Sequence, residues 1–186
     1  MGISQRELAR RIGVSASMVS QIESGQSKPS VSTLYAIVTE LGVSVDDIFG
    51  GGNGLTAAAG AGDDPGSTDG GVDHGPMVRV EDRHVIDLDS GVRWERLTSH
   101  QHERVDFLHV VYDVGGSSAS DTKMMRHPGR EYGVVLEGRL GVQLGFEEYA
   151  LDPGDSIAFD STRPHRLWNL GDVPVKGIWF VVGREG

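Results

Sequence analysis

Three arginines near the N-terminus are the first side chains whose type and spacing indicate a chemistry. Arg6, Arg10 and Arg11 fall, at helical spacing, on the side of one short segment that lies opposite its apolar residues. Guanidinium groups on an exposed face bind phosphate, and residues 1–35 carry four Lys or Arg against two Asp or Glu. The segment therefore has the local charge of a nucleic-acid contact, although the whole chain has a formal net charge of -10.

Two short helices must position these arginines. Residues 4–7 (SQRE) have the capping-box pattern, in which the Ser4 hydroxyl accepts from the Glu7 amide and the Glu7 carboxylate returns to the Ser4 amide. Gly13 suits a tight turn with positive φ, and Ser15 can cap a second helix. Two helices joined by a Gly-containing turn form a helix-turn-helix, whose second helix would enter a DNA major groove.

Residues 4–49 resemble the DNA-binding domain of the XRE family, which includes the lambda-type phage repressors. The resemblance rests on the stretches SQRELARRIGVS, QIESGQSKPSVSTL and LGVSVDDIF. It implies a double-stranded DNA operator as partner and a role in transcription regulation. By alignment with the family, the DNA contacts come from the cap residue Ser15, from Ala16, Ser17, Ser20 and Gln21 at base edges, and from Gln5 and Lys28 at phosphates.

The same resemblance implies one more helix before the capping box, whereas the sequence begins on the turn that follows that helix. We therefore expect an all-α domain whose first helix is missing and whose apolar surface is partly uncovered. The side chains that the missing helix would cover include Leu8, Val19 and Leu34. A third helix should follow Ser30 and end at Gly42, and a short fourth helix should occupy residues 44–49.

Composition restricts the remaining classes of protein. The chain of 186 residues has no cysteine, which excludes disulfides, thiolate metal sites and thiol nucleophiles. It has no apolar run of membrane-spanning length and no secretion signal, so we expect a soluble cytoplasmic protein without a membrane partner. Residues 50–76 contain ten glycines and four aspartates but no lysine or arginine, which predicts a disordered linker. The domains at 1–49 and 77–186 should then reorient freely.

From residue 78 to residue 182 the apolar period changes to two, with Gly and Asp between the apolar segments. The strands predicted from this pattern cover residues 85–88, 106–112, 132–136, 140–144, 156–159 and 176–182. Many short strands at this spacing favour an all-β barrel or jelly roll. The predicted fold class is therefore α + β, with a helix-turn-helix domain followed by a β-barrel.

Two stretches of the β-rich half resemble the motifs of the cupin family. The segment from His127 to Glu131, with Gly138 further on, is similar to the first cupin motif from its second histidine onward. Residues 154–159, followed by His165 and Asn169, are similar to the second motif. The resemblance implies that the barrel is a cupin domain.

In metal-binding cupins, the first motif supplies two histidines and a glutamate, and the second motif supplies a further histidine. The matching positions here are His127, Glu131 and His165, while Met125 occupies the position of the first histidine. Asp160 and Thr162 also replace the usual Pro and Gly of the second motif. Two interpretations stay open: a divalent metal site built from two imidazoles and one carboxylate, or a hydrogen-bonded polar patch that helps to bind an organic effector.

Three functional hypotheses follow. The first is a transcriptional regulator that binds DNA as a homodimer and senses a small-molecule effector in its cupin domain, without being an enzyme. The second is a mononuclear non-haem iron oxygenase or epoxidase that uses the His-x3-Glu…His set, since a few such enzymes join the same two folds. The third is a non-catalytic cupin whose helical domain serves protein association.

The first hypothesis predicts how two substitutions differ. Gln21→Ala should relax the sequence preference of DNA binding by roughly 1–3 kcal/mol, because Gln can pair bidentately with adenine. Lys28→Ala should weaken binding to all sequences alike and flatten the dependence on salt. Selection from a random DNA library and binding measured at several salt concentrations test both. An unchanged selected sequence for Gln21→Ala would contradict the assignment of the reading face.

Overall fold

The computed structural model describes residues 3–43, 45, 76–99, 105–119 and 124–183. Its helical part comprises α1 (Gln5–Ile12), α2 (Ala16–Glu23) and α3 (Val31–Leu41). Serine hydroxyls cap all three helices by accepting from the backbone, with Ser4, Ser15 and Ser30 at the N-cap positions. Gly13 ends α1 and Gly42 ends α3 in the left-handed conformation, at φ 72° and 66°. The predicted helix-turn-helix is confirmed.

One half of the predicted capping box is wrong. Ser4 accepts from the Glu7 amide as expected, but the Glu7 carboxylate accepts from Arg10 and Arg11. Two guanidinium groups on the same helix face offer charge-assisted bonds, which the neutral Ser4 amide does not match. The predicted fourth helix and the predicted linker lie outside the described residues, except for Val45, which is buried, and Pro76.

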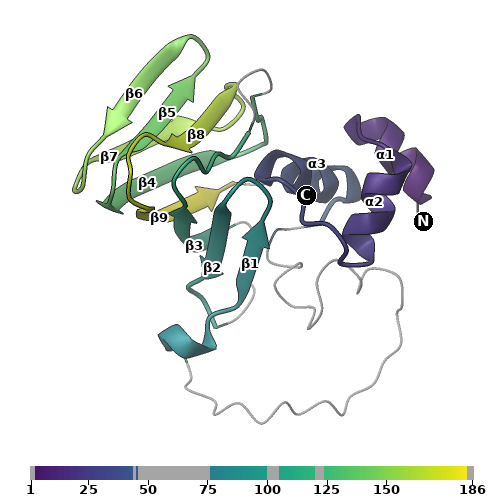
Figure 1. Ribbon diagram of the computed structural model, residues 1–186, viewed down its shortest axis with the longest axis horizontal. Coiled ribbons are helices and arrows are strands. Elements are labelled where there is room, and N and C mark those ends of the chain that lie inside the picture. Colours follow the sequence, from purple (N-terminus) through teal and green to yellow (C-terminus); the bar gives the residue numbers. More distant parts are fainter. Residues whose placement is uncertain (1–2, 44, 46–75, 100–104, 120–123, 184–186) are drawn as a thin grey trace.

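The β-rich half consists of antiparallel strands in two sheets (Figure 1). The strands are β1 (Val85–Leu88), β2 (Val92–Arg96), β3 (Val105–Tyr112), β4 (Arg130–Glu137), β5 (Leu140–Leu144), β6 (Glu147–Leu151), β7 (Ser156–Asp160), β8 (His165–Asn169) and β9 (Val175–Val182). A six-stranded sheet has the order β1-β2-β3-β9-β4-β7, and a three-stranded sheet has the order β6-β5-β8. A short 3-10 helix, η2 (Val80–Asp82), precedes β1.

The inner faces of the two sheets share one hydrophobic core. Buried side chains alternate along β3 and β8, as expected for strands with one face inside. Leu108 and Val135 from the larger sheet and Leu140 and Leu167 from the smaller sheet belong to one cluster of buried residues. This arrangement is a cupin-type barrel, which confirms the predicted fold class.

The expectation of freely reorienting domains is not what the structure shows. Four side chains of α3 join the core cluster of the barrel: Val31, Leu34, Tyr35 and Val38. In Figure 1, α3 lies between the strands and the other two helices. The Ser32 amide donates to the Ser118 carbonyl at 3.2 Å, and the Asp89 amide donates to the Pro29 carbonyl at 2.9 Å. Helix α3 therefore packs on the barrel as well as on α1.

The expected exposure of Leu8, Val19 and Leu34 is not what the structure shows. Leu8, Val19 and Leu34 are 5%, 1% and 0% exposed. Leu8 and Val19 pack with Ala9, while Leu34 belongs to the cluster that α3 shares with the barrel. The barrel covers part of the surface that the sequence left without a partner. No helix among the described residues is long and apolar enough to cross a membrane.

Gly133 on β4 allows the closest packing inside the barrel. A Cβ at this position would lie 2.0 Å from Cζ3 of Trp179, whose ring crosses β4 at that point. A rigid indole ring cannot move aside without displacing its neighbours in the core.

We therefore expect Gly133→Ala to lower the free energy of unfolding by about 1–3 kcal/mol, the usual range for overpacking. Urea denaturation followed by tryptophan fluorescence measures the change. The control is Gly171→Ala, where the nearest atom to a new Cβ is 3.6 Å away. Equal stability of the two variants would contradict the role of Gly133.

Candidate nucleic-acid interface and barrel site

The predicted reading face lies on α2 and is open to solvent. Ala16, Ser17, Ser20 and Gln21 are all exposed, whereas Val19 and Ile22 on the opposite face are buried. Ser15 is occupied as the cap of α2, since its Oγ accepts from the Met18 amide at 3.1 Å. This hydrogen bond fixes the first turn of α2.

The two predicted phosphate contacts are exposed but are paired with acidic groups. The Gln5 side-chain amide donates to the Glu23 carboxylate. The Lys28 Nζ lies 3.4 Å from Asp87 Oδ2 on β1, with side chains that are 61% and 52% exposed. An ion pair this exposed contributes little stability, so a phosphate can replace Asp87 as the partner of Lys28.

The barrel interior brings together the three residues that the cupin resemblance indicates. Glu131 is the second residue of β4, His165 is the first residue of β8, and His127 lies in the segment before β4. The three residues are 4%, 0% and 3% exposed. Glu131 Oε1 lies 2.9 Å from His127 Nε2 and 3.1 Å from His165 Nε2.

Backbone pairing holds these side chains in place. The amide and carbonyl of His165 pair with those of Met125 at 3.0 and 2.8 Å. The His127 amide donates to the Ser161 carbonyl at 3.1 Å. The backbone of each histidine is therefore held by a neighbouring chain segment.

The ring orientation fixes which nitrogen atoms face Glu131. Nδ1 of His127 lies 3.2 Å from the Pro128 carbonyl, and Nδ1 of His165 lies 2.8 Å from the Arg163 carbonyl. Because a carbonyl oxygen only accepts, each Nδ1 is the donor and each Nε2 is turned toward the carboxylate. The Nε2 atoms and Glu131 Oε1 nevertheless lack hydrogen-bond geometry among the described residues, despite their short separations.

Three buried ligand atoms without hydrogen-bond partners fit a divalent metal ion. The metal-ligating atoms of His127, Glu131 and His165 all lie within 4.8 Å of one another. Second-sphere bonds from each Nδ1 to a carbonyl orient metal-bound histidines in the same way. Two imidazoles and one carboxylate on one side suit Fe(II), Zn²⁺ or a related ion with further positions open.

The electrostatics of the cluster favour the ionised carboxylate. Burial alone would raise the pKa of Glu131, but the imidazoles of His127 and His165 outweigh burial and hold its pKa below the ordinary value. Burial likewise opposes protonation of His165, but Glu131 outweighs it and raises the pKa of His165. The second carboxylate oxygen, Oε2, accepts from Trp179 Nε1 at 2.7 Å. A cation bound by the three ligands would compete with a proton for Nε2 of His165.

A small cavity of about 20 Å³ adjoins Glu131. Its lining includes Trp94, Tyr112, Met125 and Trp179 from the barrel, and Val31 and Tyr35 from α3. The Trp94 indole N–H is buried and finds no acceptor among the described residues. A volume of this size holds about one water molecule. The side chain of Met125, at the place of the missing histidine, lines this space and adds a thioether.

Sequence reasoning did not assign Trp94, Tyr112 or Tyr35 to this site. Trp94 and Tyr112 lie on β2 and β3 with alternating burial, a pattern that indicates only an inward side chain. Tyr35 comes from a helix that the sequence places in a separate domain. The Tyr35 ring stacks on the His127 ring, with centroids 4.2 Å apart and an interplanar angle of 11°.

The two departures from the second cupin motif have a local explanation. Asp160 Oδ1 accepts from the Thr162 amide at 2.9 Å and from the Thr162 hydroxyl at 2.6 Å. Such a side-chain turn replaces the conformational restriction that Pro and Gly would supply. The neighbouring His165 keeps its place in β8 despite these replacements.

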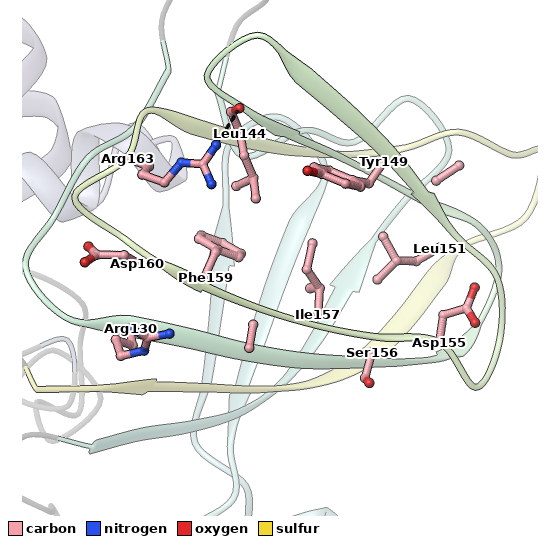
Figure 2. A pocket seen from close by; sticks show the side chains of 12 residues that line it. Arg130, Leu144, Tyr149, Leu151, Asp155, Ser156, Ile157, Phe159, Asp160 and Arg163 are labelled. Atoms are coloured by element: carbon pink, nitrogen blue, oxygen red, sulfur yellow. Dashed lines mark hydrogen bonds between the residues drawn. The ribbon is translucent and has the colours of Figure 1, made fainter.

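A second, larger hollow lies between β6 and β7, the outer strands at one side of the two sheets (Figure 2). It has a volume of about 660 Å³. Figure 2 shows Leu144, Ile157 and Phe159 pointing into it, with Arg130 and Asp160 together at one end. Phe159 also contacts the His165 ring at a centroid distance of 5.2 Å, so this side chain separates the hollow from the metal-ligand set.

Comparison with known proteins agrees with both halves of the chain. Residues 1–48 match the helix-turn-helix family, and residues 108–181 match the cupin domain family. The HTH-type transcriptional regulator PuuR of Escherichia coli (strain K12) is 25% identical over 169 residues, which are 90% of this chain and 80% of that protein. The regulator of the same name from Shigella flexneri has the same identity and coverage.

A solved structure has the same combination of elements. The HTH_3 family transcriptional regulator from Vibrio cholerae matches with a TM-score of 0.64 at 20% identity, covering 99% of this chain and 89% of that one. The present chain carries an XRE-type helix-turn-helix domain and a cupin domain. It is thus a helix-turn-helix transcriptional regulator, which confirms the family and the general function indicated by the sequence.

The geometry of the barrel site generates a test with metal ions. We expect the full chain to bind one Co²⁺ per chain, with an affinity that is still rising above the ordinary pKa of histidine, about 6.5, because the pKa of His165 is raised and its proton must be lost. Glu131→Gln should weaken binding by about 10-fold or more, since it removes the anionic ligand. Calorimetric titration and the visible spectrum of bound Co²⁺ measure both effects.

The control variant is His109→Ala, because His109 pairs with Glu95 on β2 and lies outside the ligand set. Co²⁺ affinity that is equal in Glu131→Gln and wild type would contradict the assignment of Glu131.

Proposed function

We propose that this cytoplasmic regulator binds an operator as a homodimer and that its cupin domain senses an effector at His127, Glu131 and His165. The observation that carries the proposal is the buried ligand set, whose three inward atoms lack hydrogen-bond partners among the described residues. The three atoms lie 2.9 and 3.1 Å apart as His–Glu pairs but lack hydrogen-bond geometry, an arrangement that suits a ligand or an ion contacting all three. The exposed reading face of α2 supplies the output.

Within this proposal, the divalent metal ion is itself sensed, and it also offers a binding position to an organic effector. His127 and His165 would hold the ion through Nε2 and Glu131 through Oε1. When bound, the ion would supply a Lewis-acidic position for an oxygen or nitrogen atom of the effector. The Trp94 indole N–H, on a side chain that lines the same cavity, would donate to an acceptor atom of that effector. We therefore propose an effector with at least one carboxylate, carbonyl or hydroxyl oxygen.

Binding without catalysis is favoured over the iron oxygenase alternative. The relatives that match 90% of this chain are transcriptional regulators by name. The third hypothesis, protein association through the helical domain, has no specific observation in its favour.

The homodimer is supported by the geometry of DNA reading and by the outer face of the larger sheet. One helix-turn-helix contacts a half-site, and two are spaced by about 34 Å along the duplex. On the outer sheet face, Phe107 and Phe180 stack with centroids 4.2 Å apart, and Tyr132 lies beside Phe180 in register. Tyr132 is 42% and Phe180 is 36% exposed. Such an apolar face fits a second copy of the barrel.

A DNA-selection experiment tests the regulator as a whole. We expect the selected operator to contain an inverted repeat with half-sites about one helical turn apart. The triple variant with alanine at 127, 131 and 165 should bind this operator as wild type does. In wild type, the divalent ion identified by elemental analysis should change operator affinity by about 5-fold or more, a usual size for coupling between two sites.

The triple variant should show no response to the ion, because it lacks all three ligands. A triple variant that responds as wild type does would place the sensor elsewhere in the chain. Loss of operator binding by a folded triple variant would instead show that the barrel site is needed for DNA binding itself.

A further inference from the structure

Helix α3 covers the mouth of the barrel directly above the metal-ligand set. Tyr35 stacks on His127 and lies 5.5 Å from the Trp94 ring, centroid to centroid. Val31, one turn earlier, is 1% exposed and lines the cavity beside Glu131. Two side chains of the DNA-binding unit therefore form part of the wall of the proposed effector site.

Leu34 and Val38 of α3 also belong to the core cluster of the barrel. Polar contacts beside the helix include the backbone hydrogen bonds from Ser32 to Ser118 and from Asp89 to Pro29, and the exposed pair of Lys28 with Asp87. Ion pairs of this exposure hold weakly. The helix is therefore held mainly by apolar packing, and Val31 and Tyr35 are the two of these side chains that line the cavity beside Glu131.

The opposite approach to the site is closed by the barrel itself. The larger hollow between β6 and β7, which is the groove referred to below, ends at Phe159 and Leu144. Each of these side chains is 4% exposed. Phe159 packs against the His165 ring, and Leu144 is paired with His165 in the ladder between β5 and β8. Both residues belong to strands that are paired in a sheet, so moving the backbone of this wall would break ladder hydrogen bonds.

We propose that α3 is the movable lid of the barrel site, and that an organic ligand reaches His127, Glu131 and His165 only when the turn from Val31 to Tyr35 leaves the mouth. The proposal rests on the proposed function for the existence of an effector at this site. The cavity of about 20 Å³ admits an ion or a water molecule with the lid in place. A larger effector takes the space of Tyr35, and docking of α3 and binding of that effector exclude each other.

The consequence for regulation follows from the position of α3 in the chain. The helix packs on α1 and closes the helical unit that carries the reading face of α2. Displacing α3 from the barrel therefore releases the whole helix-turn-helix from its fixed orientation. The equilibrium between docked and released α3 affects both the barrel site and the DNA-reading face. Effector binding and operator binding therefore change each other's affinity through this equilibrium.

The lid can be tested without knowing the effector, by chemical modification of histidines in the metal-free full chain. Diethyl pyrocarbonate modifies accessible neutral imidazoles, and mass spectrometry gives a rate for each histidine. In wild type, His127 and His165 should react far more slowly than the exposed His84, which serves as internal reference. Tyr35→Ala should accelerate modification of His127 by about 10-fold or more, because reaction through local opening scales with the opening equilibrium.

Two controls make the outcome specific. Thr39→Ala lies on the exposed side of the same helix and should leave both rates unchanged. Phe159→Ala opens the wall on the groove side and should affect His165 without accelerating His127. Val31→Ala is a milder change in the same turn and replaces Tyr35→Ala if that variant loses its circular dichroism signal.

The outcomes separate the lid from the proposed function. Unchanged His127 reactivity in both folded lid variants overturns the lid. Acceleration of both histidines by Phe159→Ala alone also overturns it and makes the groove the route of access. Because the reaction is carried out without metal, failure of the chain to bind Co²⁺ contradicts the proposed sensor site and leaves the result for the lid standing.

Discussion

Burial of the Glu131 carboxylate is the constraint on which the barrel interior depends. A carboxylate at this depth remains ionised only if its oxygens are matched by donors or cations. Trp179 satisfies one oxygen, and two imidazoles approach the other. The indole can reach Glu131 because Gly133 leaves its place on β4 empty of a side chain. The buried Glu131 carboxylate therefore depends on how the apolar core is packed, since Trp179 belongs to both.

Much of this architecture was predictable from local sequence signals. Serine caps and C-terminal glycines predict where the helices begin and end, because each acts within one turn. The alternation of apolar and polar residues predicts six of the strands, because one face of each strand is apolar and lies inside the barrel. Strands β2, β6 and β8 are not among the predicted ones. Charged residues occupy several positions of β2 and β6, as Arg93 and Glu95 do in β2. The half of the capping box that failed did so because Arg10 and Arg11 compete for Glu7.

The site was only partly predictable, for a different reason. The cupin resemblance indicated His127, Glu131 and His165, and the structure brings these side chains together. The stacking of Tyr35 on His127 joins two segments that the sequence assigns to separate domains. No periodicity within α3 distinguishes an apolar residue that faces α1 from one that faces a barrel. Long-range packing of this kind has no local signal.

The double packing of α3 bears on how such proteins are recombined. If the third helix of a helix-turn-helix domain contacted only its own domain, that domain could be fused to any sensor domain without loss of packing. In this protein, Val31 and Tyr35 line the cavity beside Glu131, and Leu34 belongs to the core cluster that α3 shares with the barrel. A chimaera that exchanges the first domain must therefore carry the α3 surface of its new barrel, and the functional boundary between the two modules runs through the helix rather than after it.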